Sequence, residues 1–312
     1  MVKRVSSKNG LIELFRFLCA IWVAYYHEYF PILSDKFDGV NISVDFFFMV
    51  TGLFFLKSIE KYREQSFWKG TKFIFWSRTK RFIVPLIIAA LAVLWCNLMI
   101  ELTFNGLNFP FIYLWFFVAQ FIFLSLFYLI LKNTKRMSTF NIICVVIICL
   151  SMSFFKLELT GLDIFARGPA MLALGMLLSQ VPEINIKANS EAKSQKLNLT
   201  VNIIGFTVAT LAFLYLAYLP KFQIWKLHLF TCIVCPTLLY FAKQIPVRSK
   251  FLNFLGECSI YIYLAQCPIL LHHFYISDHS PDQFPLLCVC AVAFLIINRV
   301  ANKLLTKRRV VA

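Results

Sequence analysis

The chain of 312 residues is 60% hydrophobic and 15% charged, whereas soluble domains are about 45–50% apolar and about 25% charged. These proportions exclude an ordinary soluble protein and indicate an integral membrane protein. The net charge of +16 does not indicate nucleic-acid binding, because the basic residues lie in short loops between apolar runs and no nucleic-acid recognition motif is present.

The first apolar run covers residues 11–33, which is long enough to cross a hydrocarbon core as a helix of roughly 20 residues. It nevertheless contains Glu13, Arg16 and His27. Ionisable groups within a span usually face the bundle interior or a wet cavity. At 100° per residue, Arg16 and His27 share one helix face and lie roughly 16 Å apart in depth. Glu13, one turn before Arg16, is placed to pair with its guanidinium.

A second, shorter run covers residues 42–56 and includes the string SVDFFFMVTGLFF. Asp45 lies near its start, which is expected to be the external end because the preceding loop has no basic excess. Thr51 and Gly52 offer small side chains at which another helix or a ligand can approach closely.

Residues 57–81 are rich in Lys and Arg with Phe and Trp between them. The simplest interpretation is a basic cytoplasmic segment that lies on anionic headgroups with its aromatic rings in the interface. Arg78 and Arg81 differ from the lysines, because their three-residue spacing just before the next span predicts two guanidinium groups on one face. Such a pair suits a phosphate-rich ligand, with headgroup anchoring as the alternative.

The remaining chain continues the alternation of apolar runs and short polar loops. The segment 181–196 is the most polar stretch and is expected to be a flexible cytoplasmic linker between two halves of one bundle. Further spans are expected at residues 82–100, 111–131, 138–155, 171–179, 197–219, 227–242, 254–271 and 286–304. Most of the 31 Lys and Arg then fall on one side, which predicts an all-α polytopic membrane protein with about ten transmembrane helices and both termini cytoplasmic.

Ten cysteines would indicate disulfides in a small secreted protein, but most of these lie within apolar runs, where Cys behaves as a small buried hydrophobe. Cys232 and Cys235 form a pair without a second pair to complete a four-ligand zinc site. No metal site is predicted.

An imidazole in the outer part of a span can accept a proton from a hydroxyl and so start acyl transfer. His27 alone does not establish this chemistry, because a histidine in a membrane span is more often a packing or hydrogen-bonding residue. Arg78 and Arg81 strengthen the hypothesis, since a diphosphate-bearing acyl donor needs cationic groups on the cytoplasmic side.

Several motifs together resemble the membrane acyltransferase 3 family. The first is an acid three residues before Arg16, followed by ten residues between Arg16 and His27. The others are SVDFFFMVTGLFF at 43–55, RTKRFIVP at 78–85, YLWFF at 113–117 and LGECSIYIYLAQCPI at 255–269. They occur in the expected order through most of the chain.

The resemblance implies a helix bundle that transfers an acyl group, usually acetyl from cytoplasmic acetyl-CoA, to a hydroxyl of a cell-surface or lipid-linked carbohydrate. It implies that His27 is the catalytic residue and that Arg16 holds the donor or its carbonyl. Arg78 and Arg81 would contact the CoA phosphates. The expected location is the inner (plasma) membrane, and the expected partners are acyl-CoA, the glycan acceptor and membrane lipids.

The resemblance implies less definite roles for other residues. Asp45 either orients a donor group or receives a proton, and a capping role at the start of the second helix is equally compatible. Trp115, Tyr261 and Tyr263 would line the cavity, although ordinary core packing is the simpler explanation for them. Arg167 is either an acceptor-binding group or an interfacial anchor.

Three departures from the family pattern stand out. Thr51 replaces a serine and keeps its hydroxyl. Gln266 stands where the family often has histidine, which argues against a role that requires protonation there. Ile260 replaces a frequent tyrosine, with Tyr261 and Tyr263 nearby. A single domain over residues 1–312 is expected, without a soluble extracellular domain.

Two other functions compete with acyl transfer. A secondary transporter or lipid-linked sugar flippase would use the buried charges to bind substrate or protons. A noncatalytic scaffold would tolerate replacement of Arg16 and His27.

Overall fold

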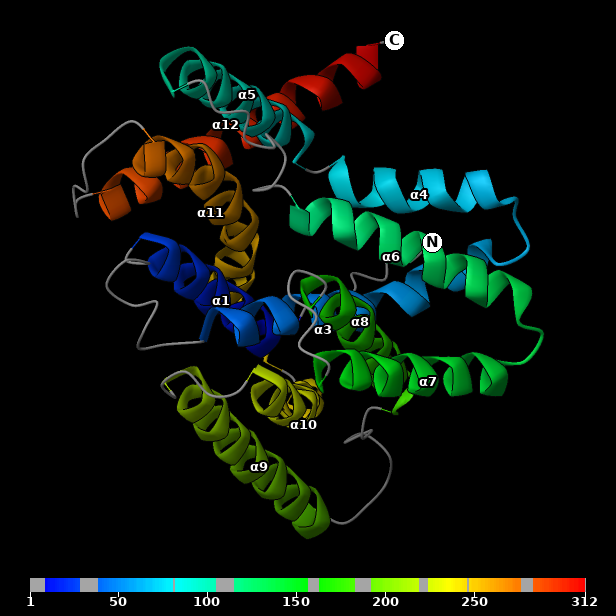
Figure 1. Ribbon diagram of the computed structural model, residues 1–312. Helices are drawn as coiled ribbons and strands as arrows, with labels where there is room; N and C mark the ends of the chain where they lie inside the picture. The colour runs from blue at the N-terminus through cyan, green and yellow to red at the C-terminus, as the bar shows by residue number, and fades with distance from the viewer. Residues whose placement is uncertain are drawn as a thin grey trace.

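The computed structural model describes residues 9–28, 39–80, 82–104, 115–156, 163–182, 192–218, 224–245, 247–275 and 283–311. In these ranges the regular structure is entirely helical (Figure 1). The helices are α1 (Gly10–Glu28), α3 (Gly39–Ile59), the 3-10 turn η1 (Glu60–Tyr62), α4 (Phe67–Thr79), α5 (Ile83–Phe104), α6 (Trp115–Asn133), α7 (Met137–Lys156), α8 (Asp163–Gln180), α9 (Ala192–Tyr218), α10 (Ile224–Gln244), α11 (Lys250–Tyr275) and α12 (Gln283–Val311).

The expected spans each overlap a long helix of the structure. Within the described residues, four stretches are long and apolar enough to cross a membrane: Ile42–Tyr62, Phe116–Asn133, Leu199–Leu216 and Pro285–Lys303. The all-helical membrane architecture is therefore confirmed, while the number of crossings and the side of the termini stay predictions. Helix α4, inside the basic segment 57–81, had not been expected as a separate helix.

Helices α3 and α8 form the centre of the bundle, with α9 at one edge and α5 and α12 at the opposite edge (Figure 1). The backbones of α3 and α8 touch at two glycines. A Cβ on Gly52 would lie 2.2 Å from the Leu172 carbonyl oxygen, and one on Gly175 would lie 2.0 Å from the Met49 carbonyl oxygen. The predicted close approach at Gly52 is confirmed, and it allows the Phe-rich helix α3 to pack closely on the Leu, Met and Ala side chains of α8.

Asn9 joins the start of α1 to the end of α10. Its Oδ1 accepts a hydrogen bond from the Leu11 amide at 2.9 Å, which caps α1. Its Nδ2 donates to the carbonyls of Ala242 and Ile245, at 2.7 and 2.9 Å. The side chain thus satisfies backbone groups at both helix ends.

Helix α4 packs against α6. A Cβ on Gly70 would lie 2.0 Å from the Tyr128 ring, so glycine is needed for this contact. The buried Tyr128 hydroxyl donates to the carbonyl of Tyr62 at 2.8 Å, with the carbonyls of Gln65 and Ser66 at 3.2 and 3.4 Å. One tyrosine therefore holds the turn that connects α3 to α4.

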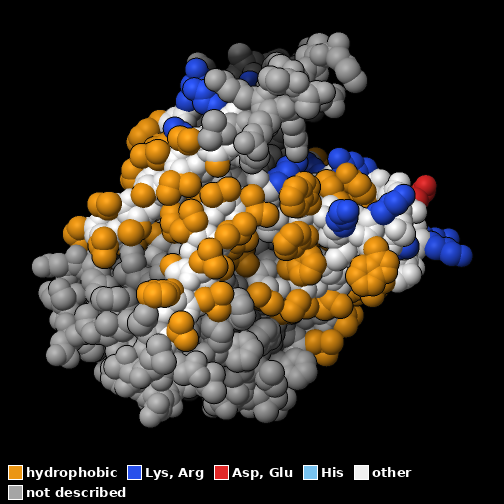
Figure 2. Space-filling model, turned by 90° about the horizontal axis from the view of Figure 1, so that it is seen from above, with side chains coloured by type: hydrophobic (Ala, Val, Ile, Leu, Met, Phe, Trp, Pro, Cys, Tyr) orange, Lys and Arg blue, Asp and Glu red, His pale blue; other side chains and the backbone are white. Residues whose placement is uncertain are grey.

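Large apolar side chains cover much of the outer surface (Figure 2). They include Leu91 and Trp95 of α5, Val208 and Leu211 of α9, and Val289 of α12, each more than half exposed. Water-soluble monomers rarely expose contiguous apolar surface on this scale. This surface is what a lipid-facing helix bundle requires.

Candidate functional site

The first part of the site is an ion pair on α1. Arg16 Nη1 lies 2.9 Å from Glu13 Oε2, as the three-residue spacing predicts. The Glu13 side chain is 4% exposed and the Arg16 side chain 29% exposed. The carboxylate is therefore buried in the bundle, while the guanidinium keeps part of its surface open.

Gly256 of α11 makes room for the Glu13 carboxylate. A Cβ at position 256 would lie 1.9 Å from Glu13 Oε2 and 2.6 Å from its Cβ. The acid occupies the volume that any other residue at 256 would fill. Gly256 lies in the motif at 255–269, so this motif positions the α1 ion pair from a helix far away in the sequence.

His27 belongs to the last turn of the unbroken helix α1, eleven residues beyond Arg16. The helix confirms the geometric basis for placing the two residues on one face. The His27 side chain lies outside the described residues, so its contacts stay a prediction.

The second part of the site is a buried charge cluster between α3, α8 and α10. Arg167 binds both carboxylate oxygens of Asp45, with Nε 3.1 Å from Oδ1 and Nη2 2.8 Å from Oδ2. His228 Nδ1 lies 3.6 Å from the same Oδ2. All three residues are buried. The Nε contact is a charge-assisted hydrogen bond and the Nη2 contact is a close ion pair, and a buried carboxylate needs a partner of this kind.

This cluster changes two interpretations made from the sequence. Asp45 lies six residues inside α3, so the prediction that it caps this helix is wrong. Arg167 is buried in α8, so the prediction of an interfacial anchor is wrong as well. His228 was missed, although an ionisable residue near the start of an apolar span is a reason to suspect function.

The packing of α1 against α3 fixes the depth of Asp45. The rings of Phe15 and Phe46 are 6.0 Å apart, and the side chains of Cys19 and Ser43 are hydrogen-bonded to each other. Residue numbers rise along one helix as they fall along the other, so the helices are antiparallel and Asp45 lies at the level of Arg16. His27 is about 16 Å further along α1 at 1.5 Å per residue. Asp45 therefore lies about three helical turns from position 27 along α1.

The predicted donor-binding residues are only partly described. Arg78 belongs to α4, but its side chain lies outside the described residues, as do the Trp115 side chain and the whole of Arg81. Helix α4 ends at Thr79, before position 81. A shared helical face for the two arginines therefore stays a prediction.

Tyr261 and Tyr263 of α11 have the contacts of packed interior residues. Asn298 Nδ2 of α12 donates to the Tyr261 hydroxyl at 2.7 Å in a buried position. The Tyr263 ring lies 5.7 and 5.2 Å from those of Phe116 and Phe117. The structure thus favours core packing for both. Gln266, one turn further on, is buried, and its Oε1 has no hydrogen-bond partner among the described residues.

Within the described part of the chain, no group of three or more His, Cys, Asp or Glu side chains is arranged to hold a metal ion. Thr51 keeps the hydroxyl expected of the family serine and uses it to accept a hydrogen bond from Gln120 Nε2 at 3.0 Å.

The helix bundle defines an integral membrane protein whose apolar interior contains buried charged residues. A family model described as an acyltransferase domain matches residues 9–299. The chain therefore belongs to the acyltransferase 3 family and is an acyltransferase, which favours an enzyme over the transporter and the noncatalytic scaffold. No curated protein and no solved structure matches it.

Proposed function

We propose that this acyltransferase moves an acyl group, specifically acetyl, from cytoplasmic acetyl-CoA to a hydroxyl of a cell-surface or lipid-linked carbohydrate. The inner (plasma) membrane is the proposed location. The observation that carries the proposal is the α1 ion pair. Its buried acid holds a partly open guanidinium eleven residues before the imidazole position on one helix face.

The distance between Arg16 and His27 indicates that the two residues have different roles. At roughly 16 Å apart in depth, they cannot both contact the reacting carbonyl. We assign Arg16 to the donor away from the reacting carbon, and His27 to the reaction itself. An extended donor such as an acyl pantetheine chain connects the two levels.

The proposed reaction needs one proton transfer and one substitution. The His27 imidazole accepts the proton of the acceptor hydroxyl, and the resulting oxygen attacks the thioester carbonyl. The new C–O bond forms as the C–S bond breaks. The CoA sulfur leaves with the electron pair of the C–S bond and takes up a proton. If His27 instead carries the acyl group, an acyl-imidazole forms first and the hydroxyl attacks it in a second step.

The decisive experiment compares His27→Ala with Leu18→Ala in purified protein supplied with isotope-labelled acetyl-CoA. Leu18 is exposed on the same helix and lies half a turn away from position 27. We expect His27→Ala to abolish labelled product while Leu18→Ala keeps it, with both proteins folded. Near-normal product from His27→Ala would refute the assignment, and a labelled protein adduct in the wild type would identify the carrier mechanism.

A further inference from the structure

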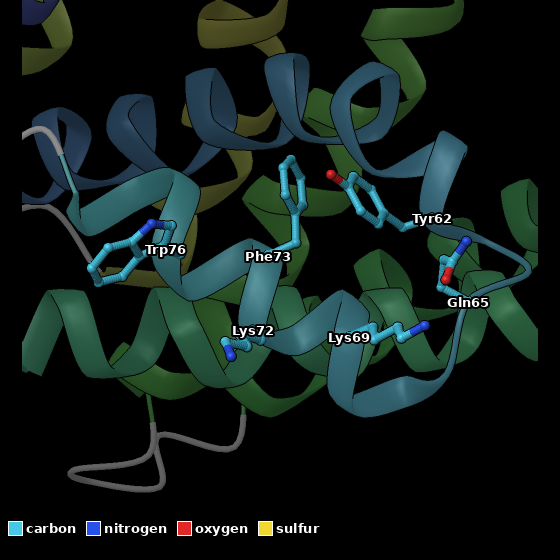
Figure 3. Close-up of a pocket in the computed structure, with 6 residues that line it drawn as sticks. All are labelled: Tyr62, Gln65, Lys69, Lys72, Phe73 and Trp76. Atoms are coloured by element: carbon cyan, nitrogen blue, oxygen red, sulfur yellow. The ribbon is translucent and has the colours of Figure 1, made fainter. Parts of the chain in front are cut away.

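A hollow of about 420 Å³ opens beside α4, and its lining combines basic and aromatic residues. Figure 3 shows Trp76 at one end and Lys69 with Gln65 at the other, with Tyr62 and Phe73 facing each other between them. Lys72 completes the lining, which contains no acidic residue. We call this hollow the α4 groove.

The α4 groove is preformed and accessible. The rings of Tyr62 and Phe73 stack with centroids 4.0 Å apart, and Lys61 Nζ lies 5.1 Å from the Tyr62 centroid. The Tyr128 hydroxyl fixes the neighbouring turn. Lys69 and Lys72 are exposed, as is Trp76 at 52%. The groove therefore has a floor of stacked aromatic rings and two exposed cations at its edge.

The lysines and Trp76 lie at different positions along α6, as the headgroup and the tail of a bound lipid would. Phe67 stacks on Tyr128 and Phe75 contacts Phe121, so α4 runs antiparallel to α6. Lys69 consequently lies roughly level with Leu126, about 10 Å from the C-terminal end of α6 at Asn133, and Trp76 lies about 10 Å further along the span. Cations on the side nearer the C-terminal end of α6, with aromatic surface further from that end, suit a lipid with a negative headgroup and an apolar tail.

The position of the groove on α4 separates it from the predicted CoA contacts. Residues 69, 72, 73 and 76 are three, four and seven apart and so share one helix face. Position 78 is nine residues from Lys69, which is 900° or half a turn away on the opposite side of α4. A nucleotide bound at Arg78 therefore approaches a different face.

We propose that the α4 groove binds one anionic phospholipid from the leaflet next to the C-terminal end of α6. Lys69 and Lys72 contact its phosphate, and Phe73 and Trp76 pack on its glycerol and acyl region. The proposal rests on the membrane location of the chain and is independent of the proposed acetyl transfer. His27→Ala protein should bind the lipid unchanged, so the two proposals can fail separately.

The test is native mass spectrometry of the full chain in neutral detergent, titrated with phosphatidylglycerol or with phosphatidylcholine carrying the same acyl chains. We expect one preferentially retained phosphatidylglycerol. Lys69→Gln with Lys72→Gln should bind it about thirtyfold more weakly, because a lysine near an anionic lipid surface contributes about 1 kcal/mol. The matched control is Lys132→Gln with Lys135→Gln at the end of α6, outside the groove, which should bind normally.

Three results would overturn the proposal. Retention of phosphatidylcholine equal to that of phosphatidylglycerol would show that the lipid's charge is not recognised. Equally weakened binding in the Lys132/Lys135 control variant would show diffuse attraction to the basic surface and no defined site. Displacement of the lipid by CoA or inorganic phosphate would make the groove an anion site of another kind. Lys69→Arg with Lys72→Arg keeps both charges and should retain the lipid, which separates lost binding from lost folding.

Discussion

Arg167 holds both carboxylate oxygens of Asp45 in the packed interior where α3 meets α8, although the two residues are 122 positions apart. A guanidinium that contacts two oxygens at once restricts the relative sliding of the helices. The pair also brings His228 of α10 to the same carboxylate. Three helices are therefore joined at one buried negative charge.

Replacing Asp45 by Asn should destabilise the protein strongly. Removing one partner of a buried ion pair leaves the other charge uncompensated, at a cost of about 3–5 kcal/mol. Replacing both Asp45 and Arg167 by Leu should recover most of this loss, because neither charge then remains. Thermal unfolding in detergent measures both variants. Additive losses in the double variant would contradict the pairing.

Gly256→Ala should disturb Arg16 without any direct contact to it. The added methyl group takes the space of the Glu13 carboxylate, and Glu13 is the partner that orients the guanidinium. If Arg16 holds the donor, the Michaelis constant for acetyl-CoA should rise about tenfold, as for loss of one hydrogen bond to a charged group. The double variant Glu13→Ala with Gly256→Ala is the control. It should be no worse than Glu13→Ala alone, since the clash is gone, and a further loss would argue against this steric link.

Gly52→Ala should destabilise the α3–α8 contact by about 1–3 kcal/mol, the usual range for overpacking a core. The new methyl group meets the Leu172 carbonyl, which cannot move without shifting α8. Gly10→Ala is a milder comparison, because its nearest neighbour is a Leu252 methyl group at 2.9 Å on a flexible side chain. Equal shifts in the melting temperatures of the two variants would show that the backbone contact at Gly52 does not determine the loss of stability.

Tyr128→Phe should loosen the turn between α3 and α4 while leaving the bundle intact. The substitution removes the hydroxyl that donates to the Tyr62 carbonyl and costs about 1 kcal/mol. Faster amide hydrogen exchange in residues 62–70, with unchanged exchange in α8, is the expected result. Tyr240→Phe of α10 serves as a matched loss of a hydroxyl elsewhere, and it should leave exchange at 62–70 unaltered.

Local patterns predicted the features that depend on short sequence separations. The Glu13–Arg16 pair follows from helical spacing, and the approach at Gly52 follows from the absence of a side chain. The helical character of the apolar runs follows from their length, because backbone groups in lipid must be satisfied internally.

The long-range contacts were not predictable in this way. Nothing local connects Asp45 with Arg167 and His228, since their meeting depends on which helix faces α3 packs together. Arg167 was interpreted from its place near a loop, whereas α8 already begins at Asp163 and carries it into the interior. Helix α4 was not predicted as a separate helix because basic and aromatic residues dominate its composition. Gly70, which allows α4 to pack on α6, does not by itself indicate such a contact in the sequence.

The double role of Asn9 has a consequence for biosynthesis. Its amide group needs the carbonyls of Ala242 and Ile245, which lie 233 and 236 positions later. A ribosome at about 5–20 residues per second requires on the order of ten seconds or more to reach them. The link between the start of α1 and the end of α10 consequently forms only after most of the polypeptide exists, so the α1 end that carries Glu13 and Arg16 is anchored late during assembly.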